Sequence, residues 1–482
     1  MSETLKQRTA RSLFWGALNN GTTQVLNVVI GIFLGRLLSP EDYGIVGVLT
    51  IFTVIAGNLQ SSGFTQALIN LKQPTARDYN SVFWFNVLAS FSIYTVLFFC
   101  APLIAWFFNE PRLVVVSRVV FLSFVVSSFG IVHNAYLLKR MMNREIAVAG
   151  VVALVCSGSV GILLAFKGYA YWSLVWQQIV YIAVMNAIRY WYVEWRPSWK
   201  IDFGPVKEMF GFSVKILFTN ILNTLSQQVL TFIFGRLFPL AAVGNYTQAN
   251  KWNTQAHSFV SGTLSQVTQP LLVTIQGDTD REQRIFRKMM RFTAFLAFPV
   301  MLGLALVSRE FIVLTITERW IQSVPLMQTL CLAGAFLPFY TLYQNLAVSS
   351  GRSDIYLRVN VVQIVLQILL VVVCSLWGIH TAVWAYSIFV IAFLLVWQEQ
   401  ARRLIGVGLK QVLADVLPFF LIAFAVMAFT GWVTAGIGSL WLLLIGRILL
   451  AAVLYAVAIK LLRPEMVNEC LEYIRSSRSA RS

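Results

Sequence analysis

Residues 146–166 read IAVAGVVALVCSGSVGILLAF, a run without a charged residue between Glu145 and Lys167. About 20 consecutive apolar residues cross the hydrocarbon core of a bilayer as one helix. Similar runs recur from Leu13 to Leu461, separated by short charged or Pro/Gly-bearing turns, and no stretch between them is long enough for an aqueous domain. The sequence therefore predicts an all-α polytopic membrane protein.

The composition supports this fold class. Hydrophobic residues make up 58% of the 482 residues, charged residues only 12%, and the mean hydropathy is +0.72. We predict about fourteen transmembrane helices, with 308–325 as a candidate re-entrant or interfacial piece. The predicted spans are 13–37, 43–70, 81–108, 114–138, 146–166, 172–193, 210–238, 241–271, 292–308, 325–350, 355–377, 379–398, 415–433 and 440–461.

The basic residues predict the topology, because Lys and Arg accumulate in cytoplasmic loops. When residues near a span end are assigned to the adjoining loop, 27 of the 37 Lys and Arg residues belong to the termini and every second loop, and three (Lys215, Lys251 and Arg447) are left within spans. The other loops carry the remaining seven, namely Arg36, Arg112, Arg118, Lys167, Arg236, Arg309 and Arg319. Both termini are predicted to be cytoplasmic, and the first apolar segment, too long for a signal-peptide core, is predicted to be retained. A net charge of +17 spread over loops does not indicate nucleic acid.

Residues typical of catalysis or metal binding form no recognisable pattern. The cysteines are an odd number, widely spaced and mostly in apolar runs, so they indicate no disulfide framework. His133, His257 and His380 lie in different spans or turns without a second ligand at helical spacing. The stretch GFTQAL at 63–68 lacks the further glycines and the Lys-Ser/Thr of a phosphate loop, and is predicted to bend or unwind the second span. We predict no catalytic residue, metal site or cofactor.

The chain repeats itself at an offset of 200 residues. Matching positions are Gly35-Arg36-Leu37 with Gly235-Arg236-Leu237, Gly44 with Gly244, and Asn20 with Asn220. Six spans separate the copies, so both halves point the same way and are related by an axis along the membrane normal. We predict one six-helix bundle over 1–200, a second over 201–400, and two further helices with a cytoplasmic tail over 401–482. Parallel repeats of this kind are typical of transporters.

Amide side chains follow one face of three predicted spans. They are Asn20, Gln24 and Asn27 in the first, Asn220, Asn223 and Gln227 in the seventh, and Gln248 and Gln255 in the eighth. Amides are costly in hydrocarbon unless they find hydrogen bonds or water. One alternative is that they join neighbouring helices. Two matched rows in equivalent helices favour a shared water-filled cavity that binds substrate.

Lys251 lies on the same face of the eighth span, within the series Gly244, Gln248, Lys251, Gln255, Ser258 and Gly262. It is about ten residues from the predicted outer end, which places its ammonium roughly 15 Å deep, near the midplane. The alternative is a shifted span from which Lys251 reaches the interface. Arg36, Arg236, Lys215 and Arg447 are candidate accessory cations, although Lys215 and Arg447 lie near span ends and could also reach the interface.

Acidic residues are missing from this predicted cavity. All twenty Asp and Glu residues fall in predicted loops, tails or helix ends. A cavity with a cation and amides but no carboxylate suits an anionic ligand that carries many hydroxyls. A sugar carried on a pyrophosphate has that chemistry.

Several motifs carry a resemblance to a known family: GRLLSPEDYGIVGV from Gly35, SGFTQALI from Ser62, GYAYWSLVWQQ from Gly168, AFPVMLGLAL from Ala297 and SSGRSDIYLRV from Ser349. With them the chain resembles the polysaccharide-transporter branch of the multidrug/oligosaccharidyl-lipid/polysaccharide exporter superfamily, close to O-antigen and exopolysaccharide flippases. The resemblance implies an inner-membrane protein that moves undecaprenyl-diphosphate-linked oligosaccharide to the periplasmic face. It also implies two bundles around a central, often cationic cavity that opens alternately to each side.

Two other functions remain open. A multidrug antiporter of the same superfamily would be expected to hold a buried carboxylate, and a membrane scaffold of a polysaccharide synthesis complex would not need polar residues in mid-span. The expected partners are the lipid-linked oligosaccharide, membrane lipids, and the polymerase and glycosyltransferases of polysaccharide synthesis.

Overall fold

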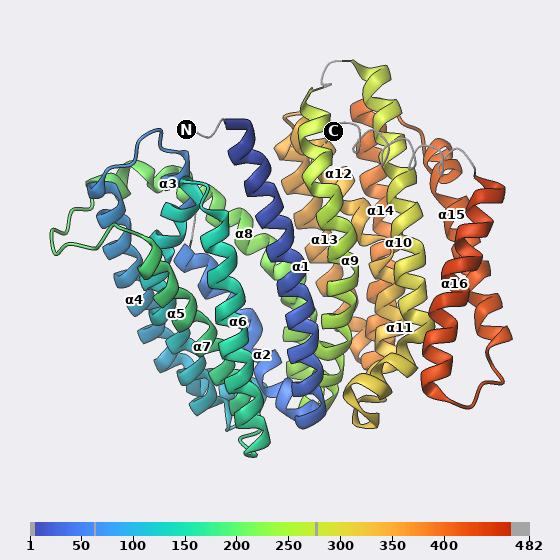
Figure 1. Ribbon diagram of the computed structural model, residues 1–482, viewed down its shortest axis with the longest axis horizontal. Coiled ribbons are helices and arrows are strands. Elements are labelled where there is room, and N and C mark those ends of the chain that lie inside the picture. The colour runs from blue at the N-terminus through green and yellow to red at the C-terminus, as the bar shows by residue number, and fades with distance from the viewer. Residues whose placement is uncertain (1–4, 62–63, 275–277, 464–482) are drawn as a thin grey trace. The chain divides into compact units, whose positions relative to one another are not determined.

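The computed structural model describes residues 5–61, 64–274 and 278–463, in which every regular element is helical (Figure 1). The helices up to residue 237 are α1 Leu5–Leu37, α2 Pro40–Ser61, α3 Phe64–Asn70, α4 Ala76–Phe108, α5 Leu113–Lys139, α6 Asn143–Phe166, α7 Trp172–Tyr192 and α8 Gly204–Leu237. After them come α9 Leu240–Thr274, α10 Thr279–Ile316, a 3-10 turn Glu318–Trp320, α11 Ser323–Gly334, α12 Leu337–Ser349, α13 Ser353–Ser375, α14 Ile379–Ile405, α15 Leu409–Val433 and α16 Leu440–Leu462.

The helices confirm the predicted fold class. Ten helical stretches in the described part of the chain are long and apolar enough to cross a membrane. Two shorter apolar stretches, Gly21–Leu37 and Gln228–Leu237, belong to α1 and α8. The count of fourteen spans stays a prediction.

Two predicted spans differ from the helices. The span 292–308 is part of α10, which continues to Ile316, so much of the candidate re-entrant piece is the end of that helix. The span 325–350 is two helices, because α11 ends at Gly334 and α12 begins at Leu337. The predicted bend at Gly63 lies outside the described residues.

The chain divides into two compact units, one ending at Gly244 and one beginning at Asn245. In the first, α1 packs on α6, α2 on α8, and α5 on both α4 and α7. In the second, α10 is central and contacts α11, α15 and α16, while α13 packs on α14. The predicted division into two six-helix bundles and a terminal helix pair stays a proposal.

Proline residues inside two long helices each free a backbone carbonyl, because proline has no N–H to donate to the residue four positions earlier. In α10, Pro299 frees the Phe295 carbonyl, and the Tyr455 hydroxyl of α16 donates to it at 3.0 Å. In α4, Pro102 frees the Phe98 carbonyl. A neighbouring helix side chain satisfies that carbonyl too.

The side chain that satisfies the Phe98 carbonyl is Arg118 of α5. Its Nε donates to the Phe98 oxygen at 3.4 Å, and its guanidinium lies 4.2 Å from the centroid of the Phe98 ring. The prediction that Arg118 is a loop charge is wrong. Arg118 lies within α5, where a freed carbonyl and an aromatic face compensate the guanidinium.

Ion pairs attach the last two helices to α10. The carboxylate of Asp415 in α15 is buried and accepts from Arg287 Nε at 2.6 Å and from Arg291 Nη1 at 3.2 Å. Nearer the other end of α10, Glu310 pairs with Arg447 of α16 at 3.0 Å and is only 2% exposed. Glu310 is therefore not the loop residue that the sequence predicts, because the longer α10 holds it inside the helix.

Candidate functional site

The middle of α9 carries polar side chains with unused hydrogen-bonding capacity. Gln248 is 0% exposed, and neither its amide nitrogen nor its amide oxygen has a hydrogen-bond partner among the described atoms. Two turns further on, the buried Oε1 of Gln255 also has none in the described structure. An unsatisfied buried polar group costs about 1–3 kcal/mol. Water or a hydroxylated ligand would relieve that cost.

Lys251 lies between these two glutamines and is half-buried. Its Nζ is 5.7 Å from the centroid of the Trp252 ring. Trp252 is buried, and its ring packs edge-to-face with the ring of Phe311, with 4.9 Å between the centroids. Within the described part of the chain, no carboxylate lies within ion-pair distance of Lys251. Further along the same face, Ser258 is exposed. Exposure therefore increases along this face, from the buried amide of Gln248 through the half-buried ammonium of Lys251 to the exposed hydroxyl of Ser258.

The predicted polar rows of α1 and α8 lie only partly among the described side chains. In α1, Gln24 is exposed and Asn27 is half-buried. Five candidates belong to α1 or α8 and have side chains outside the described ones: Asn20, Lys215, Asn220, Asn223 and Gln227. Their assignment to a substrate site stays a prediction.

One polar residue of α8 joins two helices. Thr224 is 7% exposed, and its hydroxyl accepts from Asn58 Nδ2 of α2 at 2.5 Å. This pair is interhelical, as in the alternative interpretation of the polar rows. Sequence reasoning missed Asn58, because the amides Asn58 and Gln60 are two residues apart and form no row at helical spacing in α2.

The candidate accessory cations have different surroundings. Arg36 and Arg236 are exposed at the ends of α1 and α8, and the Arg236 guanidinium lies 5.5 Å from the centroid of the Phe107 ring. Arg447 pairs with Glu310 and donates through Nη1 to the Leu306 carbonyl at 3.1 Å. These contacts give Arg447 a structural role, while its accessory role stays a prediction.

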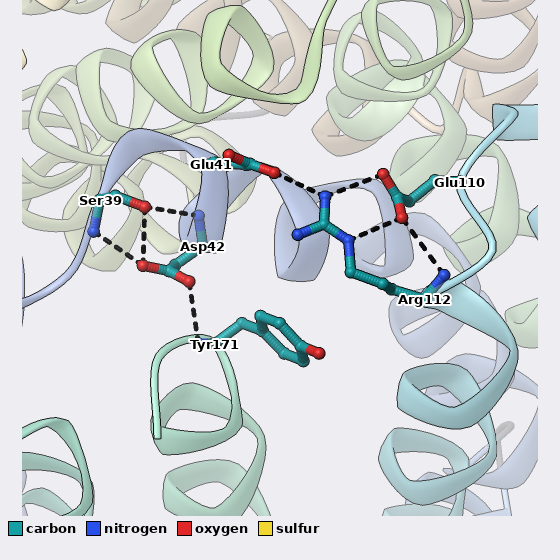
Figure 2. Close-up of polar contacts among 6 residues, drawn as sticks. All are labelled: Ser39, Glu41, Asp42, Glu110, Arg112 and Tyr171. Atoms are coloured by element: carbon teal, nitrogen blue, oxygen red, sulfur yellow. Dashed lines mark hydrogen bonds and ion pairs between the residues drawn. The ribbon is translucent and has the colours of Figure 1, made fainter. Parts of the chain in front are cut away.

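A second polar cluster holds the turn between α1 and α2 (Figure 2). The carboxylate of Asp42 accepts from the Ser39 N–H at 2.9 Å, from the Ser39 hydroxyl at 2.7 Å and from the Tyr171 N–H at 3.0 Å. Ser39 and Asp42 lie in the motif GRLLSPEDYGIVGV, and Tyr171 lies in GYAYWSLVWQQ. Two of the motifs that carried the family resemblance therefore meet through one side chain.

Arg112 ties the same turn to the loop between α4 and α5. Its guanidinium contacts Glu41 at 2.5 Å and Glu110 at 2.7 Å, as Figure 2 shows. The hydrogen bond from Arg112 lowers the pKa of Glu110 below its ordinary value. Acidic residues 41 and 42 have alanines, Ala241 and Ala242, at the matching positions 200 residues later, so the sequence of the second repeat cannot form this cluster.

In the described residues, no three His, Cys, Asp or Glu side chains gather as they would around a metal ion. Two tyrosines of α12 already have hydrogen-bond partners. Tyr340 donates to the Val390 carbonyl at 2.6 Å, and Tyr343 donates to Gln398 Oε1 at 2.8 Å. Gln248 on α9 differs from them, because neither atom of its amide has a hydrogen-bond partner among the described atoms.

Two solved structures share the fold. The match to the structure titled lipid II flippase MurJ, inward closed conformation, has a TM-score of 0.73 at 12% identity and covers 94% of this chain and 100% of that one. An inward-facing multidrug resistance MATE family transporter of the MOP superfamily matches with a TM-score of 0.61 at 14% identity, covering 84% and 95%. The chain thus shares its polytopic helical fold with these two proteins.

The sequence comparisons give the family. The profile described as polysaccharide biosynthesis protein matches residues 33–325. Teichuronic acid biosynthesis protein TuaB of Bacillus subtilis is 23% identical, covering 86% of this chain and 87% of that protein. Lipopolysaccharide biosynthesis protein WzxC of Escherichia coli is 23% identical, covering 74% and 73%, and succinoglycan biosynthesis transport protein ExoT of Rhizobium meliloti is 24% identical, covering 70% and 68%. The chain belongs to the polysaccharide biosynthesis protein family.

Proposed function

We propose that the protein is a flippase that translocates undecaprenyl-diphosphate-linked oligosaccharide from the cytoplasmic to the periplasmic leaflet by alternating access. The observation that carries the proposal is the centre of α9, where Lys251 has no described carboxylate partner and neither the nitrogen nor the oxygen of the Gln248 amide has a described hydrogen-bond partner. An unneutralised cation attracts a diphosphate, and amides bond sugar hydroxyls with a modest desolvation cost.

The relatives agree with this chemistry. Their names place them in lipopolysaccharide biosynthesis and in succinoglycan transport, and the MurJ structure is named as a flippase for a lipid-linked substrate. We further propose that the protein resides in the inner membrane with both termini in the cytoplasm. Its partners would then be the glycosyltransferases that build the substrate and the polymerase that consumes it.

The test replaces Lys251 with Ala in a strain that lacks its own copy of the gene. Surface polysaccharide should be lost, and lipid-linked oligosaccharide should accumulate on the cytoplasmic side. Lys410→Ala is the matched control, because Lys410 is exposed at the start of α15 and no described contact joins it to α9. Unchanged display in Lys251→Ala cells, with the protein inserted at normal level, would remove Lys251 from the site.

Multidrug antiport and a scaffold role predict other results. An antiporter for cationic drugs would export cationic dyes, and its activity would not depend on an ammonium that repels them. A scaffold would support polysaccharide synthesis without translocating the lipid-linked precursor. Dye efflux and precursor sidedness in the same cells separate the three functions.

A further inference from the structure

The span formed by α11 and α12 is interrupted near its middle. The two helices belong to one apolar stretch, Ser323–Ser349, and the break follows Gly334, the last residue of the 12-residue α11. At 1.5 Å per residue, that is about 18 Å from the beginning of α11. Pro338 lies in the first turn of α12 and has no N–H for the carbonyl of Gly334, four residues earlier. Non-helical backbone at this depth is tolerated only where protein or water covers it.

The side chain of Asn253 covers the break. A Cβ atom on Gly334 would overlap Asn253 Oδ1 and would come within 2.5 Å of Met301 Cε. Asn253 is 3% exposed and lies two residues from Lys251 on α9. It is the fourteenth residue of α9, hence roughly 20 Å along that helix, which agrees with the depth of the break.

The segment of α10 around Pro299 also packs against this break. Phe298, directly before Pro299, meets Phe336 at 5.3 Å between ring centroids, and Met301 follows one turn later against Gly334. The carbonyl that Pro299 frees, that of Phe295, is held by the Tyr455 hydroxyl. A continuous series of contacts therefore links Tyr455 of α16, the Pro299 segment of α10, the break after Gly334 and Asn253 of α9.

We infer that Gly334 and Tyr455 are positioning residues for Lys251, an inference that rests on the proposed function. Because Gly334 has no side chain, Asn253 of α9 can pack into the break. This contact fixes the depth and rotation of α9, and therefore the position of Lys251. Tyr455 acts indirectly. It donates to the carbonyl of Phe295, one turn before the residues of α10, Phe298 and Met301, that pack against the break. Packed cores respond to such changes by shifting between discrete arrangements.

The test measures the accessibility of position 251 directly. The five native cysteines are replaced by Ala, Lys251 is replaced by Cys, and the rate of labelling by a charged thiol reagent is measured in membranes. Gly334→Ala in this background should change the labelling rate by about threefold or more. Gly303→Ala is the matched control, since its added Cβ would meet only Met427 Cε at 3.6 Å, an ordinary contact. Asn253→Ala together with Gly334→Ala should return the rate towards its original value, because it removes the overlapping amide.

The role of Tyr455 is tested by a double-mutant cycle. Tyr455→Phe should change the labelling rate at position 251, and the change should shrink in the Pro299→Ala background, where the substituted alanine supplies the missing N–H to the Phe295 carbonyl. The inference is overturned if Gly334→Ala and Tyr455→Phe lower the melting temperature but leave the labelling rate at position 251 unchanged. Precursor translocation that survives Lys251→Ala would remove Lys251 from the proposed site without altering these labelling rates, so the two failures are distinguishable.

Discussion

Gly44 and Gly244 make reciprocal backbone contacts. A Cβ on Gly44 would overlap the carbonyl oxygen of Leu240, and a Cβ on Gly244 would overlap that of Pro40. Both glycines and both carbonyls are 200 residues apart, so each repeat offers a glycine to the first residue of the other's helix. The contact has the self-complementary form of a two-fold interface, within a single chain.

Gly44→Ala and Gly244→Ala should each destabilise the folded protein by about 1–3 kcal/mol, because an added methyl meets backbone that cannot rotate away. The measurement is thermal unfolding of the purified protein in detergent. Gly21→Ala is the control, since no atom of the described residues lies within 4 Å of the Cβ it would add. Equal melting temperatures for Gly44→Ala and the wild type would show that the two helix starts are not in contact.

Arg447→Met should destabilise the protein by about 3–5 kcal/mol, because it leaves the carboxylate of Glu310 buried without its partner. Adding Glu310→Gln removes that charge and should recover most of the loss. Arg403→Met breaks an exposed ion pair with Glu399 and should cost at most about 1 kcal/mol. If Arg447→Met proves as mild as Arg403→Met in thermal unfolding, the buried pair does not form.

Lys139→Met should loosen the end of α3. The Lys139 ammonium donates to the Ile69 carbonyl at 2.6 Å and to the Leu71 carbonyl at 2.5 Å, and so satisfies groups that a helix end leaves free. Hydrogen bonds from a charged group contribute about 1.5–3 kcal/mol each. Amide hydrogen exchange around Leu71 should speed up in this variant and stay unchanged in Lys72→Met, whose side chain is exposed. Equal exchange in both variants would argue against the cap.

The Arg112 cluster should weaken in acid. The pKa of Glu110 is lower in the folded protein than its ordinary value of 4.5. Its stabilising effect is therefore present above pH 4.5 and is lost as the pH falls below it, through the folded pKa. Melting temperatures of the wild type and Glu110→Gln should differ at neutral pH and converge below pH 4.5. A constant difference across that range would assign the effect to packing.

Local features of the sequence predicted the spans but not their ends. The apolar runs were visible, because length and hydropathy decide whether a helix crosses lipid. The end of α10 was misplaced, because Arg309 and Glu310 indicate a loop unless the distant Arg447 is known to neutralise Glu310. The break after Gly334 was likewise missed within an unbroken apolar stretch.

In the candidate site too, local sequence patterns predicted some residues and could not predict the contacts between distant ones. Lys251 and Gln248 followed from helical spacing, which one sequence window contains. The contacts of Asn253 with Gly334 and of Asn58 with Thr224 join positions far apart in the chain, and no local pattern specifies them. Asp42 and Tyr171 were present in the quoted motifs, but their hydrogen bond became apparent only from the folded chain.

The carbonyls freed by Pro102 and Pro299 carry a consequence for evolution within this family. Arg118 and Tyr455 compensate for an N–H that the prolines lack, so each pair is constrained as a unit. A lineage that replaces the proline at 299 no longer needs the hydroxyl at position 455, whereas loss of the hydroxyl first leaves the Phe295 carbonyl without its hydrogen-bond donor. Substitutions at the two positions should therefore be inherited in a fixed order, proline before tyrosine.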